Sequence, residues 1–250
     1  MDWTLVGLFT VLPLTLLSRP VLAKEGSGVS IRWLGHAAFV IEGAGKRILT
    51  DPFGQEVPYP EIRVEPDIVT VSHEHFDHNN LSGVLGKPRV LRGLTQSGDF
   101  AQIRQTTDGI SILAVPAFHD EAGGAKRGKT ALFVIDVAGL RIVHMGDLGA
   151  MPSAEHFGKL GTVDVLLIPV GGYYTIDART AGSIVERLRP KLVVPMHYKT
   201  EVIPEWPIAS LDGFIQAMSS RKVKRVGSNS ITVSRETLPE ETEVWALSHR

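Results

Sequence analysis

Four potential metal ligands fall within one six-residue run of the chain, His73-Glu74-His75-Phe76-Asp77-His78. Alternate residues of an extended segment point the same way, so His73 and His75 can converge on one ion. Asp77 and His78 can then turn toward a second ion. The alternative is a solvated loop in which each histidine is structural. The run follows the apolar segment 68–71, and loops at strand ends of α/β sheets often carry function, so a metal site is favoured.

Histidine or aspartate also follows other predicted strands. The strands are segments 110–115, 140–144 and 191–195, and the residues that follow them are His119, Asp147 and His197. Strands that run side by side place such ends at one edge of a sheet, so ligands distant in the sequence can meet in space. We therefore expect His119, Asp147 and His197 to lie beside the 73–78 run.

The remaining pattern alternates short apolar strands with helical segments. Further strands are predicted at residues 29–42 (a pair around Leu34-Gly35-His36), 47–50, 89–92, 130–137, 163–169 and 230–234. Helices are predicted at 79–86, 97–103, 178–189 and 211–220, with an irregular proline-rich loop at 54–66. Residues from about 235 read as a polar, peripheral tail. This order of elements places the fold in the layered α/β class.

Composition limits the functions open to the chain. With 250 residues, 43% of them hydrophobic, it can bury one sizeable core, so a single domain is expected over residues 24–250. The 26 Lys and Arg against 27 Asp and Glu give a net charge of −1, which disfavours nucleic acid as a partner. The absence of cysteine excludes disulfides and thiolate metal sites, and leaves imidazole and carboxylate as the strong metal ligands.

Residues 1–23 have the pattern of a secretory signal peptide. An apolar stretch at 5–17 is broken by Pro13, and Ala23 precedes the charged pair Lys24-Glu25. Cleavage near Ala23 would export the mature chain to the periplasm or the extracellular space. Asp2 stands where a basic residue is usual, so the alternatives are an uncleaved anchor or a mis-set start codon, the latter leaving the protein cytoplasmic. The stretch is short against the roughly 20 residues of a membrane span, so no stable span is expected.

With the ligand positions in order, the chain resembles the metallo-β-lactamase superfamily. The marker is H-x-H-x-D-H followed by a later His, a later Asp and a final His, and the resemblance covers about residues 29 to 234. It implies a four-layer αββα sandwich, in which two sheets pack face to face and helices cover both sides. It also implies the ligand sets: one metal is bound by His73, His75 and His119, the other by Asp77, His78 and His197, and Asp147 bridges the two.

Within the superfamily, the chain is more similar to the branch that contains ascorbate-6-phosphate lactonase and, more distantly, the N-acyl-phosphatidylethanolamine phospholipase D enzymes. The segments that carry this similarity are 33–39, Asp51-Pro52, 168–169, 171–175 and 195–198. The branch narrows the substrate only slightly, to a small-molecule or lipid-like ester or phosphoester.

The ligand sets imply hydrolysis by a metal-bridging hydroxide. A metal lowers the pKa of bound water from about 15.7 to about 7, so hydroxide becomes available to attack an ester, a lactone or a phosphodiester. Asp77 and Asp147 are the predicted catalytic carboxylates: Asp77 orients the water and Asp147 sets the metal separation.

His75 decides between zinc and iron in this interpretation. Diiron relatives usually carry glutamate at this position, so histidine favours Zn²⁺, with Mn²⁺ as the second choice. The competing hypotheses are a diiron redox or oxygen-handling protein of the same fold and a non-catalytic metal-binding envelope protein.

Other residues have weaker assignments. His36, together with Asp51, is either an outer partner of the ligands or a structural residue at a turn. Tyr173 and Tyr174 either line the pocket or pack against other residues. The side chains that can meet an anionic substrate group, or are simply solvated, are Lys199 and the loop residues Lys126, Arg127 and Lys129. The histidines expected outside the site are His144, which should pack locally, and His156 and His249, which should lie at the surface.

Overall fold

The computed structural model describes residue 1 and residues 28–250 of the chain. The predicted signal peptide therefore lies, apart from Met1, outside the described residues. Among the helices of the described part, none combines the length and the apolar character needed to cross a membrane.

The first sheet contains six strands in the order β13-β1-β2-β3-β4-β5. Their bounds are β1 Val29–Gly35, β2 Ala38–Gly43, β3 Lys46–Thr50, β4 Ile68–Val71, β5 Arg89–Arg92 and β13 Ser230–Val233. β13, β1, β2 and β3 pair antiparallel, whereas β3, β4 and β5 pair parallel. β4, in the parallel part of the sheet, thus ends two residues before His73, where the histidine run begins.

The second sheet contains eight strands in the order β12-β14-β11-β10-β9-β8-β7-β6. Their bounds are β6 Arg104–Thr107, β7 Ile110–Phe118, β8 Lys129–Val137, β9 Leu140–His144, β10 Val165–Pro169, β11 Leu192–Met196, β12 Lys222–Arg225 and β14 Glu243–Ala246. β7, β8 and β9 form an antiparallel meander, and β9, β10 and β11 are parallel. β10 and β11 are buried along their whole length, as their apolar sequences predict.

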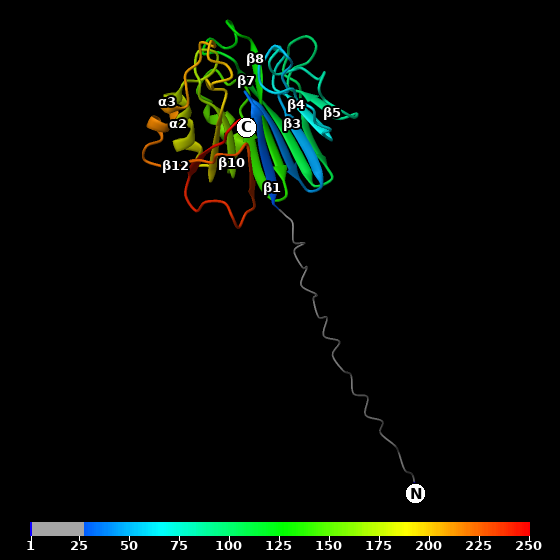
Figure 1. Cartoon of the computed structure of the whole chain (residues 1–250). Helices are drawn as coiled ribbons and strands as arrows, with labels where there is room; N and C mark the ends of the chain where they lie inside the picture. Colours follow the sequence, from blue (N-terminus) through cyan, green and yellow to red (C-terminus); the bar gives the residue numbers. More distant parts are fainter. Residues whose placement is uncertain (2–27) are drawn as a thin grey trace.

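Alternation along the strands of the first sheet creates two apolar faces. Phe39 and Ile41 of β2 face the second sheet and join a core cluster with Phe133 and Ile135 of β8. The other face of β2 packs on a second cluster formed with loop residues, which include Val57, Tyr59, Ile62, Ile203 and Ile208. The two sheets therefore pack face to face, and loops cover the outer side of the first (Figure 1).

The helices lie against the second sheet. Their bounds are α1 Ala154–Leu160, α2 Ala178–Leu188 and α3 Asp212–Ala217. Asp177 caps α2 by accepting a hydrogen bond from the Thr180 N–H at 2.7 Å, and α2 and α3 lie together beside β10 and β12 (Figure 1). The expected layered α/β sandwich of two sheets is confirmed. The helices expected on both sides are found against the second sheet, and loop residues take their place on the first.

Three of the element predictions are wrong. Residues 79–86 and 97–103 form turns and short bridges, not helices. At 79–86 the Asn80 side chain accepts from the Ser82 N–H, an Asx turn that competes with a helix. The tail after residue 235 is not peripheral, because β14 inserts between β12 and β11 and buries Val244.

Candidate metal centre

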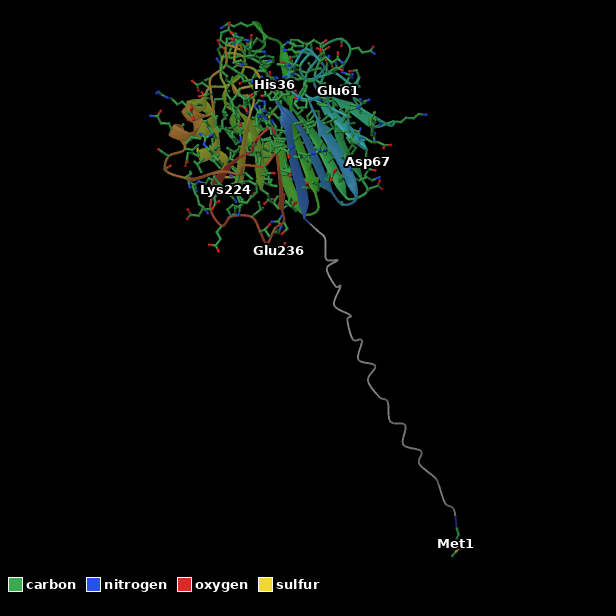
Figure 2. The ribbon with its side chains drawn as sticks, in the orientation of Figure 1. Met1, His36, Glu61, Asp67, Lys224 and Glu236 are labelled. Carbon is green, nitrogen blue, oxygen red and sulfur yellow. The ribbon has the colours of Figure 1, made fainter. Side chains whose placement is uncertain are left out.

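The predicted ligands follow strands that all finish at one end of the molecule. His73 follows β4 of the first sheet, and His119, Asp147 and His197 follow β7, β9 and β11 of the second. Figure 2 shows His36, which follows β1, at this same end, whereas Glu236 lies at the opposite end. The expectation that these side chains meet is correct, as their distances show.

The first group contains His73, His75 and His119, whose ligand atoms all lie within 4.8 Å of one another. The ring centroids are 4.4 Å apart for His73 and His75 and 4.8 Å apart for His73 and His119. His73 and His119 are buried, and His75 is exposed toward a cavity. Three imidazoles in this arrangement can hold one ion.

The second group contains Asp77, His78, His197 and also His36, again within 4.8 Å of one another. His36 Nε2 lies 3.1 Å from Asp77 Oδ2 and 3.2 Å from His78 Nε2. His36 thus contacts two predicted ligands directly. This contact is the one expected of an outer partner, not of a residue that only forms a turn. The turn position of His36 after β1 gave no sign of this contact, which depends on how β1 meets the 73–78 run.

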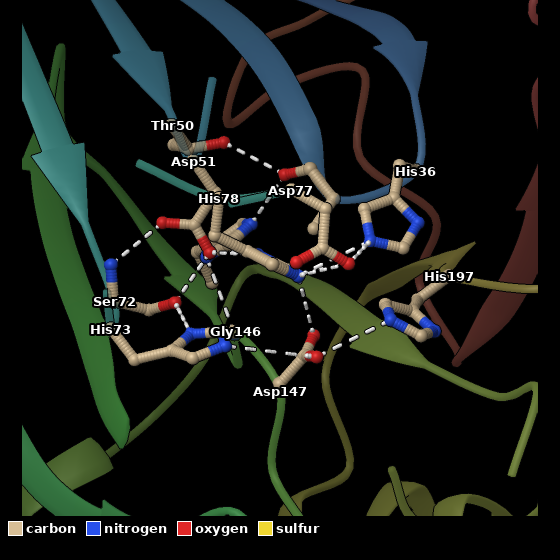
Figure 3. A network of polar contacts seen from close by, with 12 residues as sticks. His36, Thr50, Asp51, Ser72, His73, Asp77, His78, Gly146, Asp147 and His197 are labelled. Carbon is tan, nitrogen blue, oxygen red and sulfur yellow. Dashed lines mark hydrogen bonds and ion pairs between the residues drawn. The ribbon is translucent and has the colours of Figure 1, made fainter. Parts of the chain in front are cut away.

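Asp147 lies between His73 of the first group and His197 of the second (Figure 3). Its Oδ2 is 3.2 Å from His119 Nε2 and 3.3 Å from His197 Nε2, and its Oδ1 is 3.3 Å from His78 Nε2. One carboxylate therefore contacts an imidazole of the first group and two of the second.

Asp51 orients the imidazoles of His73 and His78 through hydrogen bonds on their Nδ1 side. Its carboxylate accepts from the Ser72 N–H at 2.7 Å, from the Ser72 hydroxyl at 2.5 Å and from His78 Nδ1 at 3.0 Å. The Ser72 oxygen in turn lies 2.9 Å from His73 Nδ1. This network assigns the protons to Nδ1 of His73 and His78, so their Nε2 atoms present lone pairs to the centre. Asp51 thus contacts His78 directly, which is the role of outer partner that the sequence offered for it together with His36.

The donor set fits divalent cations. His73 Nε2 is buried and has no hydrogen-bond partner among the described residues, which is costly unless another species binds it. Asp147 is 2% exposed, and burying a carboxylate requires nearby positive charge. Imidazole and carboxylate together suit zinc and manganese.

Burial keeps three of the six imidazoles neutral. It lowers the pKa of His36 to about 4, with a further lowering by the neighbouring His197. Burial also lowers the pKa of His73 and, to a smaller degree, of the more exposed His75. Neutral imidazole is the form that binds a metal, so these side chains are prepared for binding.

The carboxylates of Asp147 and Asp77 stay ionised. Burial favours the neutral form of Asp147, but the imidazoles of His197 and His78 outweigh it and hold its pKa well below the usual range. Burial likewise opposes ionisation of His78, yet Asp147 and Asp77 raise the pKa of His78 above its ordinary value. The centre thus attracts positive charge, which a proton on His78 or a divalent cation can supply.

Three residues of the centre have a strained backbone conformation. His36, Asp51 and His197 have φ values of 51°, 39° and 51°, in the left-handed region that non-glycine residues rarely adopt. Such a conformation costs about 1–3 kcal/mol and persists where surrounding structure imposes it. Here it turns each side chain from the end of its strand into the centre.

Comparison with known proteins places this geometry in a family. Residues 30–197 match the model of the beta-lactamase superfamily domain. Over 207 residues the chain is 35% identical to a UPF0173 metal-dependent hydrolase of Pyrococcus abyssi, covering 74% of this chain and 88% of the relative. The chain belongs to the metallo-β-lactamase superfamily.

Solved members of the superfamily share the fold. A Thermotoga maritima protein assigned as a zinc-dependent hydrolase aligns with a TM-score of 0.70 and 32% identity over 88% of this chain and 100% of that one. Igni18, a metallo hydrolase of Ignicoccus hospitalis, aligns with a TM-score of 0.59 and 26% identity over 82% and 97% of the two chains. The similarity to the ascorbate-6-phosphate lactonase branch of the superfamily stays a prediction.

A cavity of about 740 Å³ opens onto the proposed metal ligands, and its lining shows which other predicted residues lie near them. Its lining contains His75, His119 and Asp147 together with Lys126, Arg127 and Tyr174. Tyr173 instead lines a larger hollow beside α2 and α3, and Lys199 lines a third, next to Trp33. Lys129 pairs with Asp99 at 2.9 Å. Tyr174, Lys126 and Arg127 are therefore the candidates for substrate contact.

The remaining histidines have structural contacts. His144 Nε2 lies 2.8 Å from the carbonyl oxygen of Ala37, as local packing predicts. His156 takes part in the capping of α1 through Ser153. His249 was expected at the surface, but it is 9% exposed and packs edge-on against Trp33 and Tyr59. The surface prediction for His249 is wrong because β14 carries the C-terminus back into the fold.

Proposed function

We propose that the protein is a dinuclear metal-dependent hydrolase that cleaves an ester, a lactone or a phosphodiester bond. The observation that carries the proposal is the position of Asp147 between two groups of imidazole and carboxylate ligands. The substrate class is a small-molecule or lipid-like ester or phosphoester, which would enter through the cavity of about 740 Å³.

In this proposal His73, His75 and His119 would hold one ion, Asp77, His78 and His197 would hold the other, and Asp147 would contribute a ligand to both sites. Bound Zn²⁺, or Mn²⁺ as the alternative, supplies hydroxide at neutral pH by lowering the pKa of water from about 15.7 to about 7.

Asp77 is the residue of the chain that orients the attacking water. It lines the cavity with its side chain 15% exposed, so it contacts both the ligands and the substrate space. Burial opposes its ionisation, but His78 and His36 outweigh burial and keep the Asp77 pKa low, so the side chain is an acceptor at neutral pH. An acceptor carboxylate can hold the water's proton and aim its oxygen lone pair at the substrate.

The experiment is metal analysis of the purified protein coupled to turnover of a panel of lactones, phosphodiesters and phospholipids. We expect two equivalents of zinc or manganese per chain, and turnover of at least one ester class. In His73→Ala and Asp147→Ala, we expect metal content to fall by one equivalent or more and turnover to fall by at least about 100-fold, as for loss of other metal-centre residues.

Asp67→Asn is the matched control, because Asp67 is an exposed carboxylate outside the cavity and its loss should leave metal content and turnover unchanged. Unchanged turnover in both ligand variants would remove this centre from the mechanism. Iron as the main metal, without hydrolysis of any substrate, would favour the diiron alternative.

A further inference from the structure

The loop that follows His119 is folded around one buried carboxylate. The two oxygens of Asp120 accept hydrogen bonds of between 2.7 and 3.0 Å from four backbone N–H groups, those of Ala122, Gly124, Lys126 and Arg127. Asp120 itself is 1% exposed. The His119 N–H donates to the carbonyl oxygen of Gly128 at 3.0 Å and closes the loop. The backbone of Arg127 is thus tied to the residue next to a proposed ligand.

The Arg127 side chain lies over aromatic rings at the mouth of the site. Its guanidinium carbon is 5.7 Å from the ring centroid of Tyr174 and 6.0 Å from that of Tyr173. Arg127 lines the cavity that contains His75, His119 and Asp147. Across residues 28–250, no carboxylate oxygen lies within 4.0 Å of its guanidinium, whereas the neighbouring Lys126 is paired with Glu121. Arg127 is therefore the cation of this cavity whose charge is not neutralised.

The acidic residues of the cavity limit how much negative charge it can take. Glu74 is neutralised by Arg92 at 2.6 Å. Glu56 and Glu205 also line the cavity and have no ion pair within the described part of the chain. Outside the metal ligands, the cavity wall therefore has two free carboxylates and one free guanidinium, so Arg127 is the place on this wall where one anionic group can bind.

The apolar part of the cavity wall gives the rest of such a molecule a place to pack. Phe76, which is 57% exposed, and Trp206 both line the cavity. Phe76 stands inside the histidine run between His75 and Asp77, so an apolar group that contacts it lies next to the proposed attacking water. Aromatic side chains exposed at a cavity are typical of ligand contacts.

We propose that Arg127 binds an oxyanion group of the substrate, and that the substrate is a small ester or lactone with a single negative charge and an apolar portion. This inference rests on the proposed hydrolytic function for the reaction, and on the loop around Asp120 for the binding. The planar guanidinium matches a carboxylate or phosphate with two parallel hydrogen bonds, and the tyrosine faces restrict its orientation.

Binding is tested with benzenesulfonate, a small aromatic anion that coordinates metals weakly, by calorimetry on the metal-loaded protein. We expect saturable binding to the native protein and binding about 10- to 100-fold weaker in Arg127→Gln, the loss typical of one charge-assisted pair. Arg127→Lys keeps the charge without the planar fork and should lie between them. Arg63→Gln is the matched control, because Arg63 is an exposed arginine outside the cavity.

Equal affinity in Arg127→Gln and the native protein, or no saturable binding to the native protein, would overturn the assignment of Arg127. A second readout compares phenyl acetate with 4-acetoxybenzoate, which adds one carboxylate to the same ester. The ratio of kcat/KM for the charged ester to that for the neutral one should fall about 10- to 100-fold in Arg127→Gln, mainly through KM. If the native protein hydrolyses neither ester, the hydrolytic proposal is weakened, while the benzenesulfonate result still decides the role of Arg127.

Discussion

Asp51 shows how a residue that is not a proposed ligand can control a metal centre. Its carboxylate binds His78 Nδ1 directly and reaches His73 Nδ1 through the Ser72 hydroxyl. Both imidazoles are therefore held in the tautomer that leaves Nε2 free on the side of Asp147. Outer partners of this kind fix ring orientation and raise ligand basicity.

Asp51→Asn should weaken metal binding by about 10- to 100-fold, in line with the loss of such partners in other metal sites. Asparagine can present its amide NH₂ to His78, and this favours the tautomer whose proton lies on Nε2, where the metal would bind. The affinity is measured by competition with a chelating dye. Asp67→Asn is the control, because Asp67 also accepts a backbone hydrogen bond, from Arg47 at 2.8 Å, but lies outside the cavity. Equal affinity in Asp51→Asn and the control would contradict the role of Asp51.

The residues that the sequence identified are those whose signal is local. The spacing of the 73–78 run and the position of His119, Asp147 and His197 after apolar strands can be read along the chain. For His36 and Asp51 the sequence left two roles open, because their contacts depend on the turn between β1 and β2 and the end of β3 meeting the histidine run. Spacing cannot report which distant turn will face a ligand.

At the scale of elements, glycines allow the strand ends to approach one another. A Cβ on Gly149 would lie 2.1 Å from the carbonyl carbon of His119 and 2.2 Å from the amide nitrogen of Asp120. A Cβ on Gly171 would lie 2.3 Å from the carbonyl oxygen of His197. Both obstacles are backbone, which cannot move without moving a proposed ligand. These glycines therefore help to set the positions of His119 and His197.

Gly149→Ala should lower the free energy of unfolding by about 1–3 kcal/mol, the usual cost of overpacking, and weaken metal binding because His119 must shift. Urea denaturation of the protein with and without added zinc measures both effects. The control is Gly158→Ala in α1, where a Cβ meets no atom within 4 Å. Alanine there should raise stability by about 0.5–1 kcal/mol, since glycine is unfavourable inside a helix. Equal effects of the two substitutions would contradict the packing argument.

Elements with long apolar runs were predictable, and short polar ones were not. β8, β10 and β11 have runs of buried apolar residues and lie within a residue or two of their predicted bounds. β6 and β12 were missed because RQTT and KVKR are polar strands at the two edges of the second sheet, where pairing depends on a single neighbour. Helix α1 has one buried residue, Leu160, which is too little to produce a helical pattern.

For the whole molecule, the C-terminal strand joins two parts of the second sheet that are far apart in sequence. β14 pairs parallel with β11 on one side and with β12 on the other. In and next to this strand, Val244, Ala246 and Leu247 are buried, and the Thr242 hydroxyl donates to the carbonyl oxygen of Pro190 at 2.6 Å. Without β14, β12 has no strand partner in the described sheet. The C-terminus is thus a structural part of the domain.

A chain that ends at Leu238 should lose about 3–6 kcal/mol of unfolding free energy, because full burial of a Val or Leu side chain contributes about 1.5–3 kcal/mol. Against a typical total of about 5–15 kcal/mol, this loss leaves a marginal or unfolded protein. The matched comparison is a chain that begins at Lys24, the first residue after the predicted signal peptide, which should unfold at the same urea concentration as the full chain. Far-UV circular dichroism and urea midpoints of the three chains measure the difference. Equal midpoints for the chain ending at Leu238 and the full chain would contradict this prediction. They would mean that the last residues are peripheral, as the sequence predicted, and that the edge of the sheet is stable without β14.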